Sequence, residues 1–303
     1  MILLVLTIFI ALITASGYSK LLWWFTILDF FRLQYACLAI IVAIACIYLG
    51  QYGLFAINII IALVNLYRIR RFFPHMPHMP KQDANKTLFS INAYKENENL
   101  GKLQDILQKT DPEIMLIMEM TESHEKKLMK LLSIYPYRLQ TPVRDGFSIC
   151  LLSKTVLEDT QITHHGPSDT PLLHAKAVID GKKYQIYSAH PKPALNKKWH
   201  EDRHQYFAEI RHTLAKNNSD DIPVIVMGDF NSVPWEKHFT KFLDECGLRS
   251  TIKDQGYKVT WPVYFPVLGI PMDHILISKG EKYNNVQVGP SVGSDHFPLS
   301  LNL

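Results

Sequence analysis

The sequence predicts an α/β domain built from two packed β-sheets flanked by helices, preceded by an apolar helical segment. Hydrophobic residues make up 48% of the 303-residue chain and charged residues 20%, which excludes a disordered protein. Residues 1–67 hold only three charged side chains, whereas residues 87–303 alternate short apolar runs with stretches of helical periodicity. Strands joined both by tight turns and by helices are typical of two sheets covered by helices.

Two uncharged runs, residues 1–19 and 33–67, predict helices that span a membrane. The second run has 35 residues, which is enough for two spans of about 17 residues if the Gly50-Gln51-Tyr52-Gly53 turn separates them. We therefore expect a membrane segment over residues 1–71 with three transmembrane helices, near 2–19, 33–49 and 54–70. The alternative is a cleaved signal peptide followed by a buried hairpin, but a signal peptide usually begins with basic residues and none precedes Lys20.

The basic residues beside these runs predict the orientation of the chain. Lys20 and Arg32 share one short loop, and Arg68, Arg70 and Arg71 follow the third span on the same side of the membrane. The N-terminus and the turn at 50–53 carry no lysine or arginine, so the positive-inside rule puts the domain after the segment in the cytoplasm. We expect a multi-pass protein of the inner or cell membrane, if the source is bacterial, that contacts the lipid bilayer through its N-terminal helices.

Residues 72–86 predict an extended tether, because Pro74, Pro77 and Pro80 prevent a helix. His75 and His78 offer only two metal ligands, which favours a plain linker over a metal site. Six of the 32 basic and two of the 28 acidic side chains lie before Lys86, so the remaining 26 of each sign leave the following domain formally neutral. This balance argues against nucleic-acid binding through a large basic face, although it leaves room for a local patch.

The elements of the domain at 87–303 follow from its hydrophobic patterns. Helices are expected at 98–110, 122–134, 197–217 and 235–246, where apolar residues recur three and four apart. Gly181-Lys182 predicts a hairpin turn between two of the strands. Strands are expected at Thr87–Asn92, Ile114–Met118, Ser148–Ser153, Ala175–Ile179, Tyr184–Ala189, Val224–Met227, His274–Ser278 and Leu299–Leu301.

Polar side chains follow several of these strands at the point where each strand ends. A carboxylate or amide there points into a cleft from a rigid support, although a single one is more often an ordinary turn former. The set favours a functional site, and it comprises Asn92, Glu119, His190, Asp229, Asn231, Asp273, Asp295 and His296.

This combination of side chains suits metal-assisted hydrolysis of a phosphoester. Carboxylate oxygens are the ligands that Mg²⁺ and Mn²⁺ prefer, and such an ion also takes phosphate oxygens. Histidines supply hydrogen-bond donors and proton transfer around a phosphoryl group. The sequence offers neither a glycine-rich phosphate loop nor a serine nucleophile elbow.

Three short motifs carry a resemblance to a known family. Gly228-Asp229-Phe230-Asn231, Met272-Asp273-His274-Ile275 and Gly293-Ser294-Asp295-His296-Phe297-Pro298-Leu299, with Asn92 and Glu119 upstream, resemble the endonuclease/exonuclease/phosphatase superfamily over about residues 86–303. That group includes pancreatic deoxyribonuclease, abasic-site endonucleases, inositol polyphosphate 5-phosphatases and neutral sphingomyelinases. Ala189-His190-Pro191 and the multi-span N-terminus resemble its membrane-anchored bacterial members. The resemblance implies a four-layer α/β sandwich, two packed mixed sheets flanked by helices, at 87–303.

The resemblance also implies a role for each residue. Glu119 would be the principal ligand of Mg²⁺ or Mn²⁺, with Asn92 beside it and Asp295 as a further ligand. Asp229 and Asn231 would orient or activate the nucleophile and hold the phosphoryl group. His296 would contact the scissile phosphate, with Asp273 as its orienting carboxylate, and His190 would donate to a phosphate oxygen or the leaving group. The division of acid and base between His190 and His296 stays open.

Other polar and aromatic residues receive less specific predictions. His200, His204 and His212 are expected on the surface of the helix at 197–217. Trp261 and Tyr264 either line a substrate groove or pack on the core.

The substrate stays open among DNA, RNA, phosphorylated lipids and small phosphoesters, because enzymes with this fold and these residues act on all of them. The membrane segment favours one alternative, a phospholipase C-like enzyme or phosphoinositide phosphatase that acts on membrane lipid. An alternative of another class is a catalytically silent binding module at the membrane, against which the intact motif set speaks. A membrane assembly capped by the domain is disfavoured by the scarcity of intramembrane charge. No obligate protein partner is inferred.

Overall fold

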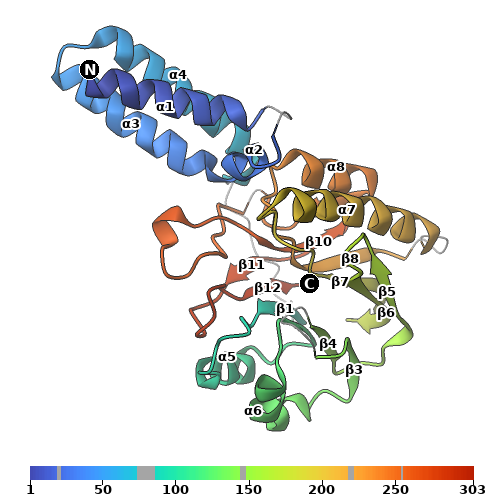
Figure 1. The fold of residues 1–303 in the computed structure, drawn as a ribbon. Coiled ribbons are helices and arrows are strands. Elements are labelled where there is room, and N and C mark those ends of the chain that lie inside the picture. Colours follow the sequence, from blue (N-terminus) through green and yellow to red (C-terminus); the bar gives the residue numbers. More distant parts are fainter. Residues whose placement is uncertain (19–21, 74–85, 144–147, 218–221, 254) are drawn as a thin grey trace.

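The computed structural model describes residues 1–18, 22–73, 86–143, 148–217, 222–253 and 255–303. It contains an N-terminal helical unit that projects from an α/β domain (Figure 1). The predicted tether at 72–86, with His75 and His78, lies almost wholly outside the described residues.

Three apolar helices pack side by side in the helical unit: α1 (Ile2–Ser16), α3 (Arg32–Tyr48) and α4 (Tyr52–Ile69) (Figure 1). Short helices, α2 (Phe25–Leu28), η1 (Asp29–Phe31) and η2 (Arg70–Phe72), adjoin them. Buried amides bind across the helices, because Asn58 Nδ2 donates to Thr7 Oγ1 (2.7 Å) and Asn65 Nδ2 donates to Thr14 Oγ1 (2.9 Å). In apolar surroundings such pairs fix which faces of the helices meet.

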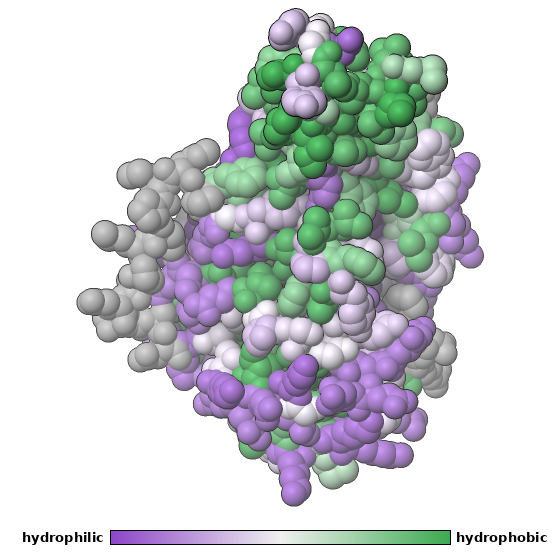
Figure 2. Space-filling view, turned by 90° about the vertical axis from the view of Figure 1, so that its left-hand side faces the viewer, coloured by the Kyte–Doolittle hydropathy of each residue, from purple (hydrophilic) through white to green (hydrophobic). Residues whose placement is uncertain are grey.

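Two stretches, Phe25–Tyr48 and Tyr52–Phe72, are long and apolar enough to cross a membrane by length and composition. The second contains the span expected at 54–70, and the first covers the span expected at 33–49 except for its last residue. The span expected at 2–19 is shorter, because α1 ends at Ser16 and at 1.5 Å per residue covers about 22 Å of a hydrocarbon core about 30 Å thick. Figure 2 shows hydrophobic residues gathered at one end of the molecule and hydrophilic residues at the other.

The α/β domain contains two mixed six-stranded sheets. The first sheet has the order β11-β12-β1-β2-β4-β3, from β1 (Thr87–Asn92), β2 (Ile114–Met118), β3 (Tyr137–Gln140), β4 (Ile149–Ser153), β11 (Val286–Val288) and β12 (Leu299–Asn302). The second has the order β5-β6-β7-β8-β10-β9, from β5 (Glu158–His165), β6 (Thr170–Ile179), β7 (Lys182–Ala189), β8 (Val224–Asp229), β9 (Leu248–Ser250) and β10 (Asp273–Ser278).

Helices cover the outer faces of both sheets, which confirms the four-layer α/β sandwich (Figure 1). Helices α5 (Gly101–Thr110) and α6 (Glu122–Leu132) lie on the first sheet, and α7 (Lys197–Asn217) and α8 (Lys237–Glu245) lie on the second. Strand β2 shows the alternation, since Leu116 joins the core between the sheets while Met115 and Ile117 join the core under α5 and α6.

Most predicted elements are confirmed, and β1, β2 and α7 have the expected bounds. The Gly181 hairpin is confirmed by the pairing of Ile179 with Lys182. Strands β3, β5, β9 and β11 were not predicted. The polar sequence of β5 gives no apolar run because this strand lies at the edge of the second sheet with most of its residues exposed.

The helical unit packs directly on the α/β domain. Trp235 Nε1 donates a hydrogen bond to the backbone oxygen of Asp29 (2.8 Å), and the Phe72 ring centroid lies 5.5 Å from that of Trp235. Phe30, Ile69 and Phe72 join the same apolar cluster as the residues between the sheets. The two parts are therefore held together by a shared core.

Candidate active site

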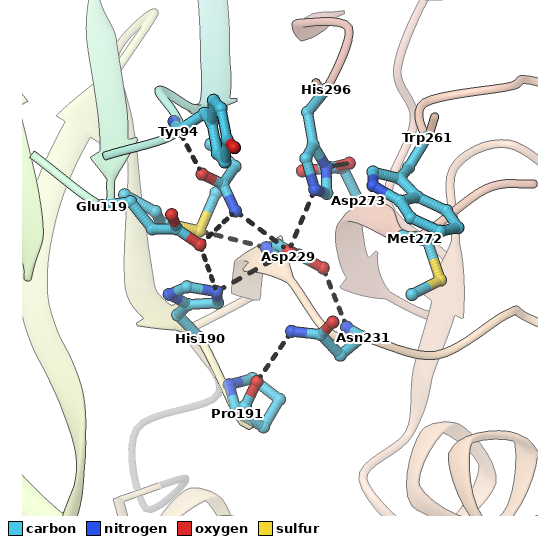
Figure 3. Close-up of polar contacts among 12 residues, drawn as sticks. Tyr94, Glu119, His190, Pro191, Asp229, Asn231, Trp261, Met272, Asp273 and His296 are labelled. Carbon is cyan, nitrogen blue, oxygen red and sulfur yellow. Dashed lines mark hydrogen bonds and ion pairs between the residues drawn. The ribbon is translucent and has the colours of Figure 1, made fainter. Parts of the chain in front are cut away.

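The predicted polar residues meet at one edge of the sandwich, where strands of both sheets end (Figure 3). Asn92 ends β1 and Glu119 follows β2, and these two strands run parallel. His190 follows β7 and Asp229 ends the parallel strand β8. Asp273 begins β10, which runs antiparallel to β8 with Asp273 opposite Asp229. The strand register therefore brings these side chains together.

The carboxylate of Asp229 lies at the centre of the site. Asn92 Nδ2 lies 3.2 Å from Asp229 Oδ2 and 3.0 Å from Glu119 Oε1, so this amide links the two sheets. Asp229 Oδ1 accepts a hydrogen bond from the backbone N–H of Asn231 (2.8 Å). These donors fix the orientation of a carboxylate that is almost fully buried.

Two imidazoles flank Asp229 (Figure 3). His190 Nε2 lies 3.6 Å from Asp229 Oδ2 and 3.8 Å from Glu119 Oε1. His296 Nε2 lies 3.7 Å from the same Asp229 oxygen, and its Nδ1 lies 2.8 Å from Asp273 Oδ2. The Asp273 contact orients the His296 ring, as carboxylates orient catalytic histidines elsewhere.

The charges of these groups depend on one another. Burial raises the pKa of Asp229, but the adjacent His296 and His190 outweigh this effect and lower the pKa to about 2. Burial lowers the pKa of His296, but Asp273 and Asp229 outweigh it and raise the pKa to about 10. The site therefore favours an ionised Asp229 beside a protonated His296.

Close backbone contacts support this arrangement. Gly228 has a φ of +154°, and a Cβ atom there would lie 1.8 Å from the backbone oxygen of Ala189 in β7. Asn231 has a φ of +48°, and its Nδ2 donates to Pro191 O (2.9 Å). The glycine before Asp229 therefore lets β8 approach the strand that ends at His190.

Two supporting residues were not predicted from the sequence. Arg203 of α7 donates from Nη1 to the backbone oxygen of Asn231. Thr260 Oγ1 accepts hydrogen bonds from the backbone N–H groups of Met272 (2.9 Å) and Asp273 (3.0 Å). Neither residue belongs to the three motifs that predicted the site, so the sequence analysis had no signal for these contacts.

The residues expected to hold a metal ion, Glu119, Asn92 and Asp295, lie at the same edge but are not all in mutual contact. Asp295 Oδ2 accepts a hydrogen bond from Trp261 Nε1 (3.1 Å), whereas its Oδ1 is buried without a hydrogen-bond partner among the described residues. Burial raises the pKa of Asp295, and the nearby Glu119 and Asp229 add to the rise. An unpartnered buried oxygen near other carboxylates fits a divalent cation such as Mg²⁺ or Mn²⁺.

Some predictions about nearby residues need correction. His200 is buried and His204 is half-buried, so their prediction as surface residues was wrong, whereas His212 is exposed as expected. His200 and His204 lie between α7 and α8, and the helical period alone did not reveal that contact. Trp261 contacts Asp295 at the site, while the side chain of Tyr264 is largely exposed.

His274 beside the site predicts a loss of stability in acid. It is fully buried, its Nε2 lies 2.9 Å from Ser232 O, and burial lowers its pKa to about 4. Below a pH of about 6.5 the unfolded chain binds a proton that the folded chain rejects, so the stabilisation present above that pH is lost as the pH falls towards 4. We expect a loss of roughly 2–3 kcal/mol between pH 7 and 4.5 by this mechanism.

The measurement is denaturant unfolding of the full chain in detergent micelles at both pH values, for the wild type and His274→Gln. The variant lacks the titrating ring, so its unfolding free energy should fall less than that of the wild type. An equal fall in both proteins would contradict the assignment.

Comparisons with known proteins identify the family and the fold. The sequence of residues 89–296 matches the model of the Endonuclease/Exonuclease/phosphatase family. Among solved structures, a humanized D. rerio TDP2 matches with a TM-score of 0.58 and 17% identity over 72% of this chain and 98% of that chain. A mannosyl-6-phosphatase of Bacteroides thetaiotaomicron matches with a TM-score of 0.58 and 16% identity over 72% and 99%.

The human Nocturnin catalytic domain, solved with a bound sulfate anion, matches with a TM-score of 0.54 and 15% identity over 72% of this chain and 93% of that chain. At these identities the solved structures establish the fold alone. No curated protein matches the sequence significantly. The family match covers more than half of the chain and includes every candidate site residue from Asn92 to His296. The chain therefore belongs to the endonuclease/exonuclease/phosphatase family, whose members are metal-dependent hydrolases of phosphoester bonds.

Proposed function

We propose that this chain is a membrane-anchored phosphoester hydrolase in which Asp229 activates a water molecule. The carboxylate of Asp229, fixed by Asn92 and Asn231 and flanked by two imidazole Nε2 atoms, is the observation that carries the proposal. A buried carboxylate with fixed donors on one side and cationic donors on the other suits proton removal beside a phosphoryl group.

The residues divide the reaction between them. Asp229 accepts the proton of the attacking water as the water oxygen forms a bond to phosphorus, and the bond from phosphorus to the leaving oxygen breaks. His296 and His190 present Nε2 donors to the phosphoryl and leaving oxygens, and one of them returns a proton to the leaving oxygen. Asp273 holds the His296 ring in place through Nδ1. Arg203 and Pro191 hold Asn231, whose backbone N–H orients Asp229.

Glu119, Asn92 and Asp295 would hold the divalent cation, which when bound neutralises charge that develops on the phosphoryl oxygens. We expect EDTA to abolish hydrolysis and Mg²⁺ or Mn²⁺ to restore it. Glu119→Gln removes one ligand charge and should raise the Mg²⁺ concentration for half-maximal activity at least about tenfold. Glu122→Gln, a nearby acid at the start of α6, is the control. An unchanged Mg²⁺ dependence in Glu119→Gln would contradict the ligand role.

The experiment that tests the function is hydrolysis by the full chain in detergent micelles. The substrates are single-stranded DNA, RNA, a nitrophenyl phosphodiester, a nitrophenyl phosphomonoester, a phosphoinositide and sphingomyelin. A D. rerio TDP2 has been solved with a single-strand DNA product and another neighbour is a sugar phosphatase, so both diesters and monoesters belong in the panel. Metal-dependent turnover that Asp229→Asn removes would support the enzyme. Binding of a substrate without turnover would favour a silent binding module.

An exposed apolar loop favours a membrane lipid as a second candidate substrate class. Tyr264, Phe265, Val267 and Leu268 are all more than half exposed, and they follow Trp261, which contacts Asp295 at the site. Gln34 of α3 donates to the backbone oxygen of Gly269 (3.0 Å), so the loop also adjoins a candidate membrane helix. Such a loop suits an enzyme whose cleft opens at a lipid surface. Phe265→Ser with Val267→Ser should then lower turnover of lipid in vesicles and spare a soluble phosphoester.

We propose the membrane topology from the two apolar stretches and the arginines that follow them. The helices within Phe25–Tyr48 and Tyr52–Phe72 would span the membrane, with α1 beside them, and Arg68, Arg70 and Arg71 would lie on the cytoplasmic side with the catalytic domain. The N-terminus and the turn after Tyr48 lie at the far end of the helical unit (Figure 1). A reporter fused after Leu303 should be active in the cytoplasm, and activity only outside it would reverse the orientation.

A further inference from the structure

A second cluster of metal-binding side chains lies between α7, α8 and the helical unit. His200 and His204 are four residues apart on α7, so they share one face of that helix. His238 lies in the first turn of α8, two residues after Glu236, the N-cap residue of that helix. Two helices and the loop before α8 therefore bring three imidazoles and one carboxylate together.

The geometry of the cluster is close to that of a metal site. One ligand atom each from His204, Glu236 and His238 lies within 4.8 Å of the others. The His204 ring centroid lies 3.5 Å from that of His238 and 4.0 Å from that of His200. Ligands around a tetrahedral Zn²⁺ ion are roughly 3–4 Å apart, and the His204 and His238 rings, which are stacked with 20° between their planes, would turn to direct one nitrogen each at the ion.

Two imidazole nitrogens of the cluster form no hydrogen bond within the described part of the protein. His200 Nδ1 and His204 Nε2 are buried and lack a hydrogen-bond partner among the described residues. A buried polar atom without a partner is costly, and stacked imidazoles cannot all carry a proton without repulsion. Neutral imidazole nitrogens are the form that binds a metal ion.

The cluster opens to a cavity that both acidic and basic side chains line. The cluster lines a cavity of about 480 Å³, which also contacts Tyr18, Trp23 and Asp29 of the helical unit. Asp29, Glu201 and Glu236 lie along the cavity, as do Lys197 and Lys237. Glu236 also accepts hydrogen bonds from the backbone N–H groups of His238 and Phe239 (both 3.1 Å). These bonds orient its carboxylate, as hydrogen bonds commonly orient carboxylates that bind a metal ion.

We propose that His204, His238 and Glu236, with His200 as the adjacent fourth ligand, form a binding site for a transition-metal ion, Zn²⁺ in particular. Imidazole nitrogens select Zn²⁺ over Mg²⁺, so this site is chemically distinct from the carboxylate and amide set at Glu119, Asn92 and Asp295. His200-Glu201-Asp202-Arg203-His204 has the H-E-x-x-H spacing of zinc-binding helices. Glu201, however, faces Lys197 (3.8 Å), so the assignment is to metal binding and not to a second hydrolysis.

A bound ion would join the active-site loop to α7. Glu236 accepts a hydrogen bond from the Oγ of Ser232 (3.0 Å), which follows Asn231 in the sequence. Arg203, which lies between His200 and His204 on α7, donates a hydrogen bond to the backbone oxygen of Asn231. The ion would therefore tie the start of α8 and the loop after β8 to the helix that supports Asn231. This places a structural ion where α7, α8 and the N-terminal helices meet.

The test is Zn²⁺ binding to the full chain in detergent micelles, without a polyhistidine tag and with excess Mg²⁺ to fill the carboxylate site. We expect one Zn²⁺ per chain by elemental analysis after dialysis and a higher unfolding midpoint with Zn²⁺ than without it. His204→Asn with His238→Asn should lose that ion or bind it at least about a hundredfold more weakly. His212→Asn, an exposed histidine on the same helix, is the matched control and should bind as the wild type does.

Two outcomes would overturn the proposal. One is a wild-type chain that retains no Zn²⁺ under these conditions, and the other is a folded double variant that binds Zn²⁺ as the wild type does. Should the double variant not fold, the wild type with Co²⁺ in place of Zn²⁺ decides, because a four-coordinate imidazole site gives intense visible bands and an octahedral oxygen site gives weak ones. Weak bands alone would then reject the site. None of these readouts depends on hydrolytic activity, so they are independent of the proposed function.

Discussion

Asp229→Asn is expected to lower kcat/KM for phosphoester hydrolysis about a thousandfold while the protein remains folded. The amide cannot accept the proton of the attacking water, and general-base catalysis commonly contributes two to four orders of magnitude. The new amide also faces donors on both sides, since Asn92 Nδ2 and the Asn231 N–H contact the two carboxylate oxygens. In either orientation the NH₂ group of the new asparagine faces one of these two donors, which should cost about 1 kcal/mol of stability.

The measurement is steady-state hydrolysis by the full chain in detergent with saturating Mg²⁺, together with unfolding by denaturant. Asp244→Asn is the matched control, because Asp244 is an exposed acid on α8 that pairs with Lys279 (3.2 Å). It should change neither activity nor stability measurably. An Asp229→Asn protein that is folded and keeps more than a tenth of the wild-type activity would exclude Asp229 as the base.

Gly228→Ala is expected to destabilise the fold by about 3–5 kcal/mol, which is a large share of the stability of an ordinary domain. Two costs add at this position. The φ of +154° is rarely adopted by residues with a side chain, and the new methyl group would lie 1.8 Å from the backbone oxygen of Ala189. Because backbone atoms cannot move aside as a flexible side chain can, β7 and β8 would have to separate.

Gly280→Ala separates these two costs. Gly280 also has a positive φ, +97°, but nothing lies within 4 Å of a Cβ atom built there. Alanine at 280 should therefore cost only about 1–2 kcal/mol from backbone strain. Denaturant unfolding of both variants measures the difference, and equal losses would show that the contact with Ala189 carries no cost. Because β7 ends just before His190, any Gly228→Ala protein that folds should also lose activity.

The fold was predictable where local patterns coincide with burial. The five residues of β2 form a continuous apolar run because both faces of the strand are covered, so the sequence marks the strand clearly. Strand β5 carries polar residues on an exposed edge, and no local signal separates it from a loop. The same holds for β3, β9 and β11, which are short and depend on their partner strands.

The site was predictable to a similar extent. Residues at strand ends, such as Glu119 and Asp229, are recognisable in the sequence because a charged group directly after an apolar strand either faces a cleft or binds a partner. Arg203 and Thr260 act on backbone groups that are distant in sequence, and only the packing of α7 and of the segment before β10 reveals them. The imidazoles of His200 and His204 were misplaced for the same reason, since helical periodicity does not say which face meets α8.

The junction of the two sheets gives the site a mechanical property. Asn92 and Glu119 follow the course of one sheet, whereas His190, Asp229 and Asp273 belong to the other, and two of the links across the junction are the 3.2 Å contact from Asn92 to Asp229 and the 3.8 Å contact from His190 to Glu119. A slide of one sheet past the other by an ångström would break both links and leave every strand intact. The rate of turnover should therefore respond to a shift between the sheets that a measurement of secondary-structure content would not detect. Side chains such as Leu116 and Ile225, buried between the sheets, act as spacers that set the alignment of the reacting groups.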